Sequence, residues 1–190
     1  DKTKDLFLNN KFLNCNYLKN SENLGQSQSI LRGIKESTFD TIITIDADLQ
    51  NNPSDILKLY NIYVSNSKVK LVGGIRYKRK DTFTKVISSK IANTIRSAVL
   101  NDNCPDTGCS LKIFNKKIFL SFPFFDGIHR FLPALFKGYN HDTIFVAVDH
   151  RSRKYGVSKY GTIDRLFRGI RDLFKVKGII NNYSNSNSND

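Results

Sequence analysis

Short runs of β-branched and other apolar residues alternate along the chain with stretches in which apolar residues recur at helical spacing. The short runs predict strands at 11–18, 41–45, 69–77, 108–114 and 142–150, with Gly73-Gly74 interrupting the third. The helical spacing predicts helices within 23–37, after Pro53, at 84–100, at 130–139 and at 162–177. Repeated strand–helix pairs predict one α/β domain with a mostly parallel sheet, in which ligands bind at the carboxyl ends of strands.

Two aspartates, Asp46 and Asp48, come directly after the strand predicted at 41–45. Carboxylates this close repel each other unless a positive group lies beside them. A divalent metal on diphosphate oxygens would be such a group, because hard cations prefer oxygen ligands. The alternative is that Asp48 begins a polar turn and caps the helix after Pro53. The place of the pair at a strand end favours the metal site.

A cluster of basic residues follows the last predicted strand, in the stretch HRSRKYGVSKYG that starts at His150. Arg offers a planar fork of donors, Lys a point charge and Ser a hydroxyl, a combination that suits a phosphate group. The interleaved tyrosines would also suit a nucleic acid. A plain solvated basic loop is the third interpretation.

A basic amphipathic helix is predicted at about 162–177. Its apolar face is made of Ile163, Leu166, Phe167, Ile170, Leu173 and Phe174, and basic residues flank it. Such a helix is typical of an element on an anionic membrane surface, where each basic group contributes about 1 kcal/mol. The alternative is that the apolar stripe packs on the domain core. The helix predicted at 84–100 carries Lys85, Lys90 and Arg96 and could lie beside it.

The net charge of +13 implies an anionic partner: a nucleic acid, an anionic membrane or a phosphorylated substrate. The three cysteines form no CxxC pair, which favours free thiols in a reducing compartment. No run reaches the ~18 apolar residues that span a bilayer. The chain has no methionine, so we expect it to be part of a longer protein whose other parts could hold membrane anchors. The Asn- and Ser-rich end, 178–190, predicts a disordered tail.

Five segments together resemble the dolichyl-phosphate mannose synthase-like glycosyltransferases, a group of inverting family 2 enzymes with the GT-A fold. The segments are DADLQNNPSDILKL, VGGIRYKR, DTGCSLKIF, FDGIHRFLPAL and HRSRKYGVSKYG, and they follow the family's order and spacing. The resemblance implies a Rossmann-like, three-layer α/β/α domain over residues 1–177. It also implies that the first strands of this fold are missing, with the Pro-x-Tyr-Asn-Glu motif that helps hold the nucleotide base. We therefore expect this chain by itself to be inactive or poorly stable.

The resemblance assigns the acidic segment to the donor. Asp48 would ligate Mg²⁺ or Mn²⁺ on the diphosphate, Gln50 would support the same ion, and Asp46 would contact the nucleotide sugar and the metal site. Asn23 and Gly25 match the family's Asn-x-Gly loop near the nucleotide. A divalent ion would act as a Lewis acid on the charge that builds up on the leaving diphosphate.

The resemblance assigns the basic residues to phosphate groups of the donor or of a lipid acceptor. The family pattern R-x-x-G-x-S-K falls on Arg153, Gly156, Ser158 and Lys159, with Arg151 just before it. Arg76 matches the arginine of the family's Gly-Ser-Arg segment, although Ile75 replaces the small polar residue.

The acceptor that the resemblance implies is a polyprenyl phosphate, either dolichyl or undecaprenyl phosphate. A phosphate monoester has a second pKa near ~6, so it is already largely an anion at neutral pH and needs positioning more than a general base. A saccharide hydroxyl, the alternative acceptor, would need a base, for which Asp126 is the candidate. We interpret His129 as a structural histidine, and Asp106 as a turn former or a supporting residue.

The sequence therefore predicts an inverting glycosyltransferase that moves a hexose of the mannose or glucose class from GDP-mannose or UDP-glucose to a polyprenyl phosphate. Catalytic roles fall to Asp48, Arg76, Arg153 and Lys159, and we expect the protein to lie peripherally on the cytoplasmic face of a membrane. The rival from another class is a basic nucleic-acid-binding module. The strand-end acidic pair and the lack of a nucleic-acid fold signature count against it.

Overall fold

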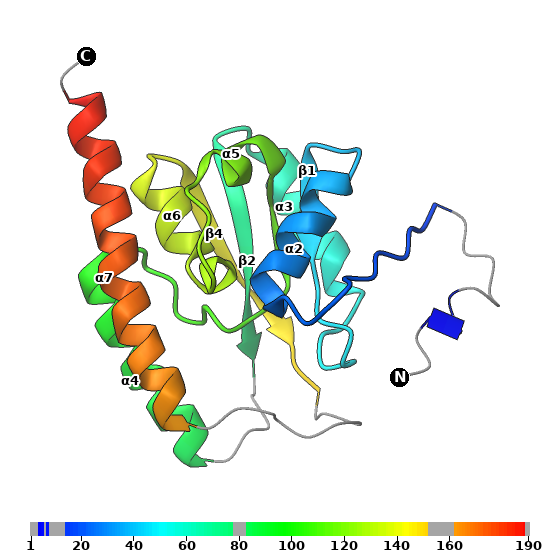
Figure 1. Ribbon diagram of the computed structural model, residues 1–190, viewed down its shortest axis with the longest axis horizontal. Helices are drawn as coiled ribbons and strands as arrows, with labels where there is room; N and C mark the ends of the chain where they lie inside the picture. The colour runs from blue at the N-terminus through cyan, green and yellow to red at the C-terminus, as the bar shows by residue number, and fades with distance from the viewer. Residues whose placement is uncertain (1–3, 6, 8–13, 78–82, 152–161, 189–190) are drawn as a thin grey trace.

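The computed structural model describes residues 4–5, 7, 14–77, 83–151 and 162–188, with the backbone alone for 83–90 and 162–168 (Figure 1). The N-terminal segment, in dark blue, runs away from the body of the domain before the first long helix begins. From Asn14 onward this segment is not a strand, so the described part of the strand predicted at 11–18 is absent.

The order of the elements follows the predicted alternation of strands and helices. The helices are α2 (Gly25–Glu36), α3 (Asp55–Ser65), α4 (Phe83–Leu100), α5 (Lys116–Ser121), α6 (Leu132–Gly138) and α7 (Thr162–Asn187), with a 3₁₀ turn η1 (Ile128–Arg130) before α6. The strands are β1 (Thr41–Thr44), β2 (Val69–Tyr77), β3 (Lys112–Asn115) and β4 (Asp142–Asp149). The short helix α5 has no counterpart in the sequence prediction.

The four strands form one mixed sheet in the order β1-β3-β2-β4. β3 lies between β1 and β2 and is antiparallel to both, whereas β2 and β4 are parallel. β1, β2 and β4 therefore point the same way. The prediction of a mostly parallel sheet is wrong, because the direction of β3 is set by pairing with residues far away in sequence, which no local pattern reports.

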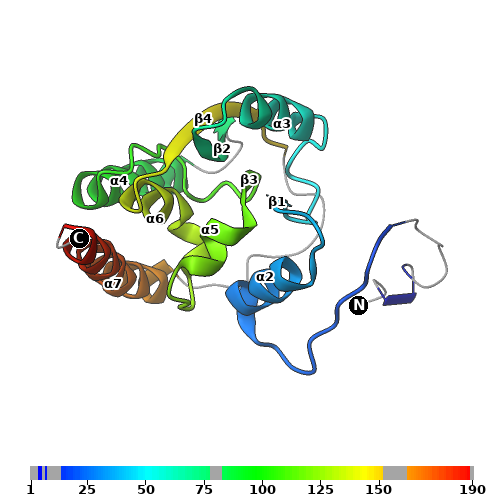
Figure 2. The same cartoon turned by 90° about the horizontal axis from the view of Figure 1, so that it is seen from above.

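Successive side chains of the two central strands alternate between two hydrophobic clusters, one on each face of the sheet. Leu71 and Phe114 belong to the larger cluster, which α2, α5, α6 and α7 complete. Val72 and Ile113 belong to the smaller cluster, which α3 covers through Leu59. Figure 2 shows the sheet between these helical layers. The three layers follow from burying both faces of the sheet.

Strand β2 runs unbroken through Gly73-Gly74, although the sequence predicts an interruption there. A Cβ at Gly74 would lie 2.9 Å from Cys109 Sγ and 2.9 Å from Val148 Cγ2. Glycine therefore serves here to let neighbouring chains approach closely, and it does not end the strand.

Helix α7 continues through 178–187, where the sequence predicts a disordered tail. Tyr183 stacks on Tyr139 with ring centroids 3.8 Å apart, and Ile180 packs against Gly138 at the end of α6. The hydroxyl of Ser184 donates to Ile180 O at 3.1 Å within the helix. Tertiary contacts of a few apolar residues thus hold a segment whose composition alone favours disorder.

The described part of α7 has one face in the core and one in solvent. Leu173 and Val176 are buried in the larger cluster, so the core interpretation of the predicted apolar stripe holds for Leu173. Ile170 is 46% exposed and Phe174 is 66% exposed. None of the helices in the described part of the chain has both the length and the apolar character that a bilayer crossing requires.

Arg96, which the sequence places among the basic residues beside the amphipathic helix, is buried. Its Nη1 lies 2.5 Å from Asp102 Oδ2, and Nη2 donates to Cys104 O. Arg96 therefore holds the loop after α4 to the helix and offers no charge to a membrane.

The contact between α6 and the end of α7 predicts the effect of two glycine substitutions. Gly138→Ala would bring a Cβ within 2.5–2.7 Å of three Ile180 atoms, and overpacking of this kind costs about 1–3 kcal/mol. We expect hydrogen exchange of 178–187 to accelerate. Gly178→Ala meets no atom within 4 Å and is the matched control, which should slow exchange through higher helix propensity. Equal exchange rates in wild type and Gly138→Ala would contradict this packing.

Candidate active site at the carboxyl edge of the sheet

The carboxyl ends of β1, β2 and β4 lie at one edge of the sheet, because these strands point the same way. We call it the carboxyl edge. Asp46 and Asp48 follow the end of β1, Arg76 is the last residue but one of β2, and Arg151 lies two residues beyond β4. The topology thus brings predicted site residues from three distant parts of the chain to the carboxyl edge. This is the edge at which α/β sheets bind ligands.

The acidic pair lies in a tight turn after β1. Asp48 Oδ1 accepts a hydrogen bond from Gln50 N–H at 3.2 Å, which closes an Asx turn. Leu49 has a φ of 64°, a left-handed conformation that is uncommon for a residue other than glycine. Asp46 is exposed and Asp48 half-buried, so the pair lies at the surface.

Backbone pairing joins this turn to the segment that follows β4. Arg151 N–H donates to Gln50 O at 2.9 Å, and Asn51 forms an antiparallel bridge with His150. The side chain of Gln50 adds a hydrogen bond from Nε2 to Arg151 O at 3.3 Å. The chain that leads into the basic cluster therefore leaves the sheet beside the acidic pair. Three predicted residues of that cluster lie outside the described part of the chain: Arg153, Ser158 and Lys159.

Arg76 is held by a buried carboxylate. Its Nε and Nη2 donate to the two oxygens of Asp106, each at 2.7 Å, and its backbone N–H donates to the same carboxylate at 3.1 Å. Such a bidentate pair fixes the plane of the guanidinium. A Cβ at Gly108 would lie 2.7 Å from Arg76 Nη2, so this position has to be small. Asp106 thus supports Arg76, and its backbone O also accepts Cys109 N–H at 3.4 Å in the turn, so both of its predicted roles fit the structure.

The predicted donor loop lies at the start of α2. Gly25, with a φ of 79°, donates its N–H to Asn23 Oδ1 at 3.2 Å. The next residue, Gln26, donates from Nε2 to Asp46 Oδ1 at 3.4 Å. A Cβ at Gly25 would lie 3.9 Å from Asp126 Oδ1. The start of α2 therefore brings the Asn-x-Gly loop next to both Asp46 and Asp126.

His129 is a structural residue, in agreement with the sequence interpretation. Its Nδ1 lies 2.8 Å from Ser27 Oγ, which also accepts a hydrogen bond from Gly127 N–H at 2.8 Å. Burial, helped by the nearby cations of Arg130 and Lys112, lowers the pKa of His129 to about 4. The imidazole is therefore neutral at pH 7 and does not serve as a general acid there.

Two residues at the site lie within the segment DTGCSLKIF but have no role predicted from the sequence. Ser110 Oγ accepts hydrogen bonds from Asp46 N–H at 3.1 Å and Asn51 Nδ2 at 2.9 Å. Lys112 is 4% exposed, and its Nζ donates to Cys109 O and to Thr107 O. Burial lowers the pKa of Lys112, a shift that acidic groups around it oppose.

The residues at the turn fit a divalent cation that is shared with phosphate groups. Asp46, Asp48 and Gln50 carry oxygen donors, which hard cations prefer. In the part of the chain that the structure describes, no group of three or more His, Cys, Asp or Glu side chains is arranged to hold a metal ion. Mg²⁺ is commonly bound by one or two carboxylates plus substrate phosphates. The donor set therefore suits Mg²⁺ or Mn²⁺ that arrives with a diphosphate.

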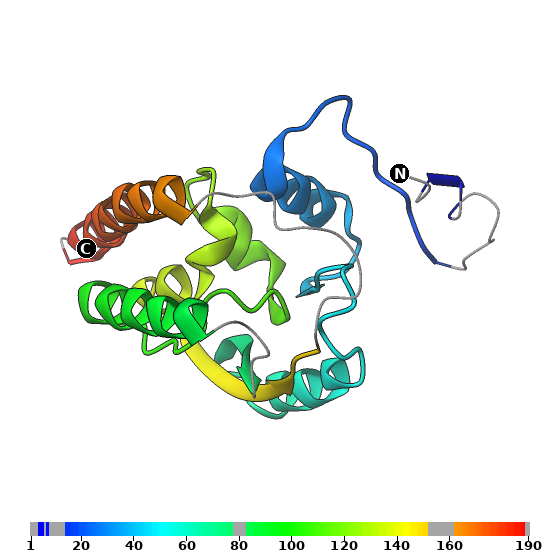
Figure 3. The same cartoon turned by 90° about the horizontal axis from the view of Figure 1, so that it is seen from below.

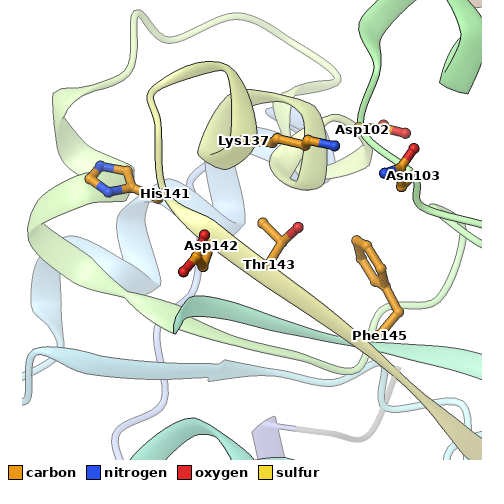
Figure 4. Close-up of a pocket in the computed structure, with 7 residues that line it drawn as sticks. All are labelled: Asp102, Asn103, Lys137, His141, Asp142, Thr143 and Phe145. Carbon is orange, nitrogen blue, oxygen red and sulfur yellow. The ribbon is translucent and has the colours of Figure 1, made fainter. Parts of the chain in front are cut away.

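A pocket of about 280 Å³ lies at the other end of β4 (Figure 4). Lys137, His141, Asp142 and Phe145 are among the residues that line it. Asp142 begins the strand and Asp149 ends it at the carboxyl edge, so the pocket lies along the first half of β4. Among the residues that the structure describes, none of the predicted site residues lines it, and we assign the candidate site to the carboxyl edge instead.

The chain is similar to known proteins over most of its length. The model of the family described as "Glycosyl transferase family 2" matches residues 1–121. "Dodecaprenyl-phosphate galacturonate synthase" of Rhizobium johnstonii is 37% identical over 157 residues, which cover 81% of this chain and 46% of that protein. "Undecaprenyl-phosphate 4-deoxy-4-formamido-L-arabinose transferase" of Yersinia pestis is 30% identical over 153 residues, which cover 80% and 46%. The chain thus spans about half the length of these curated relatives.

Solved structures share the fold at low sequence identity. Glucosyl-3-phosphoglycerate synthase from Mycobacterium tuberculosis, in complex with phosphoglyceric acid, matches with a TM-score of 0.61 and 15% identity over 82% of this chain and 56% of that chain. The same enzyme with Mn²⁺, UDP-glucose and glycerol 3-phosphate matches with a TM-score of 0.57 over 80% and 53%. These matches confirm the predicted GT-A-like α/β fold.

The burial of His129 predicts a pH-dependent stability. The unfolded imidazole takes up a proton below pH ~6.5, whereas the folded one resists protonation down to about pH 4, so stability falls as the pH falls through this window. His129→Gln should reduce the decrease in the free energy of unfolding by roughly 2 kcal/mol, a value lowered to allow for the partial exposure of the imidazole. Denaturant melts at pH 7 and pH 4.5 measure the difference. An identical pH dependence in the variant and the wild type would contradict it.

Proposed function

Because the chain belongs to glycosyl transferase family 2, we propose that it is part of an enzyme that transfers a sugar from a nucleotide sugar to a polyprenyl phosphate. The observation that carries the proposal is the pairing of Gln50 with Arg151, which joins the acidic turn to the chain that leads into the basic cluster. The names of the two relatives, both of which state a polyprenyl-phosphate sugar transfer, support it.

The acidic turn would hold the donor through a divalent cation. Asp48 and Gln50 would ligate the ion, Asp46 would contact the ion and the sugar, and Asn23 and Gly25 would lie against the nucleotide. When bound, Mg²⁺ or Mn²⁺ supplies charge neutralisation to the diphosphate as it leaves. The Mycobacterium tuberculosis synthase has been solved with Mn²⁺ or Mg²⁺ and a uridine nucleotide, which supports a metal-dependent donor site.

The proposed reaction is a single in-line displacement. An oxygen of the acceptor phosphate forms a bond to the anomeric carbon of the sugar, while the bond from that carbon to the donor β-phosphate oxygen breaks and its electron pair leaves with the nucleoside diphosphate. The configuration at the carbon is inverted. Because the acceptor enters as an anion, no proton has to be removed. Asp126 would be needed as a base only for the alternative saccharide hydroxyl acceptor.

Cationic groups would position the two phosphates. Asp106 holds the Arg76 guanidinium in one plane. Arg76 therefore loses less conformational entropy when it binds an anion. Arg151 begins the basic cluster, and the remaining positions, Arg153, Ser158 and Lys159, keep their predicted phosphate-binding roles.

The sugar is proposed at the level of a mannose- or glucose-class hexose. The relatives are named for galacturonate and for 4-deoxy-4-formamido-L-arabinose, so the narrower assignment to dolichyl-phosphate mannose synthases rests on the sequence resemblance alone.

Two helices that pack together each expose apolar residues, and we extend the proposal to a membrane surface. α4 exposes Ile91 and Ile95, α7 exposes Ile170 and Phe174, and the two helices pack together (Figure 3). Both begin at the end of the molecule to which β2 and β4 point (Figure 1). The exposed basic residues of this part of α7 are Arg171, Lys175 and Lys177. Apolar and basic groups together suit an anionic leaflet, here the cytoplasmic face of a membrane, with the protein bound peripherally through the domain proposed at 1–177.

The donor proposal predicts a metal-dependent nucleotide effect. Mn²⁺ with UDP or GDP should raise the melting temperature of the chain, since a ligand at 100 times its Kd stabilises by about 2.7 kcal/mol. Asp48→Ala should abolish the shift. Asp40→Ala, an exposed aspartate at the other end of β1, is the control and should keep it. A shift with a single-stranded oligonucleotide and none with Mn²⁺ and nucleotide would favour the nucleic-acid-binding alternative.

The membrane proposal predicts which apolar residues matter for lipid binding. The double variant Ile95→Ser, Phe174→Ser should lower binding to anionic vesicles at least tenfold in co-sedimentation, because burial of each side chain contributes about 1.5–3 kcal/mol. Leu57→Ser, Val64→Ser changes two equally exposed residues on α3, in the other helical layer, and should leave binding unchanged. Binding should weaken with salt. Equal losses in both double variants would argue against the α4–α7 surface.

A further inference from the structure

The turn between Asp106 and Lys112 touches both halves of the candidate site. At one end, the Asp106 carboxylate binds Arg76 through two side-chain contacts of 2.7 Å. At the other end, Ser110 contacts the segment that carries the acidic pair. The buried ammonium of Lys112 donates to Cys109 O and Thr107 O, which ties the middle of the turn to β3.

The hydroxyl of Ser110 links the two ends of the acidic turn. It accepts the N–H of Asp46 at 3.1 Å and Nδ2 of Asn51 at 2.9 Å, so it uses both acceptor lone pairs of a serine oxygen. Ser110 O also accepts the hydroxyl of Thr44, the last residue of β1, at 2.8 Å. Asn51 is 7% exposed, so water has little room to replace the serine there. One side chain thus holds Asp46 and Asn51, which flank Asp48 on either side.

We propose that Ser110 is a positioning residue that holds the Asp46–Asn51 turn so that its carboxylate and amide oxygens meet at one divalent cation. This inference rests on the proposed function. Mg²⁺ demands near-ideal octahedral geometry with ligands at about 2.0–2.1 Å, so a turn free to shift presents its oxygens less often in the geometry that binds. The turn at Asp106 fixes Arg76 as well, so Ser110 also sets the acidic turn relative to this arginine.

The test is the affinity for Mn²⁺ of the chain in the presence of saturating UDP, measured by isothermal titration calorimetry. Ser110→Ala should weaken Mn²⁺ binding about 10-fold, the lower end of what loss of a partner behind metal ligands costs. Ser110→Thr keeps the hydroxyl and should retain most of the affinity. Ser121→Ala removes an exposed hydroxyl that donates to Ile118 O within its own helix turn, far in sequence from the acidic turn, and should have no effect.

A second variant keeps the test decisive if Ser110→Ala fails to fold by circular dichroism. Ser110→Cys keeps the shape of the side chain but offers only a weak acceptor, and it should lower the Mn²⁺ affinity in the same direction. Wild-type affinity in a folded Ser110→Ala or Ser110→Cys variant would overturn the inference.

Asp48→Asn separates this inference from the proposed function. If Asp48→Asn abolishes Mn²⁺ binding and Ser110→Ala does not change it, the positioning role fails and the metal site stands. If Asp48→Asn binds Mn²⁺ like the wild type, the metal site itself fails, and with it the donor half of the proposed function.

Discussion

Both faces of a short sheet have to be buried at once, and this constraint fixes the strand register on which the site depends. Leu71 and Phe114 face one hydrophobic cluster, while their neighbours Val72 and Ile113 face the other. A slip of one residue would exchange the two sets, and every central side chain would meet the wrong helical layer. The register therefore cannot drift. Because it is fixed, the carboxyl ends of β1, β2 and β4 stay at the same edge of the sheet, and the chain segments that follow them meet there.

Local periodicity predicts the elements well where the signal is long or flanked by clear turns. The strand at 69–77 and the helix at 84–100 match β2 and α4 to within one residue. Local periodicity does not predict strand direction, because the direction of β3 is set by partners in β1 and β2 that are more than thirty residues away. The prediction for the end of α7 differs from the structure for a related reason. Its Asn and Ser residues favour disorder as a composition, but Ile180 and Tyr183 reach α6, and a contact of this kind leaves no trace in a local window.

In the candidate site, too, residues with a local sequence signal could be predicted and residues defined by long-range contacts could not. Asp46, Asp48 and Arg76 are visible in the sequence because each stands at the end of an apolar run, where polar side chains call for an explanation. Ser110 and Ser27 are not visible, because their partners lie 64 and 100 residues away and serines are common in turns. The sequence thus points to candidate ligand-binding groups, whereas the hydroxyls that hold them in place have no sequence signal. Asp106 falls between the two, since its turn is visible and its pairing with Arg76 is not.

The segment with Asp126 and His129 connects the site to the proposed membrane surface. On one side, Gly127 N–H donates to Ser27 at the start of α2. On the other side of the segment, Arg130 forms an ion pair of 2.7 Å with Asp172 of α7. The side chain of Asp172 is 6% exposed. A carboxylate buried against its partner resists exposure to a lipid phase, because an uncompensated charge there costs several kcal/mol. Asp172 therefore fixes the rotation of α7 about its own axis and keeps Phe174 directed outward. In the proposed complex, the packing of the protein, and not the bilayer, sets how the site is presented to a lipid phosphate.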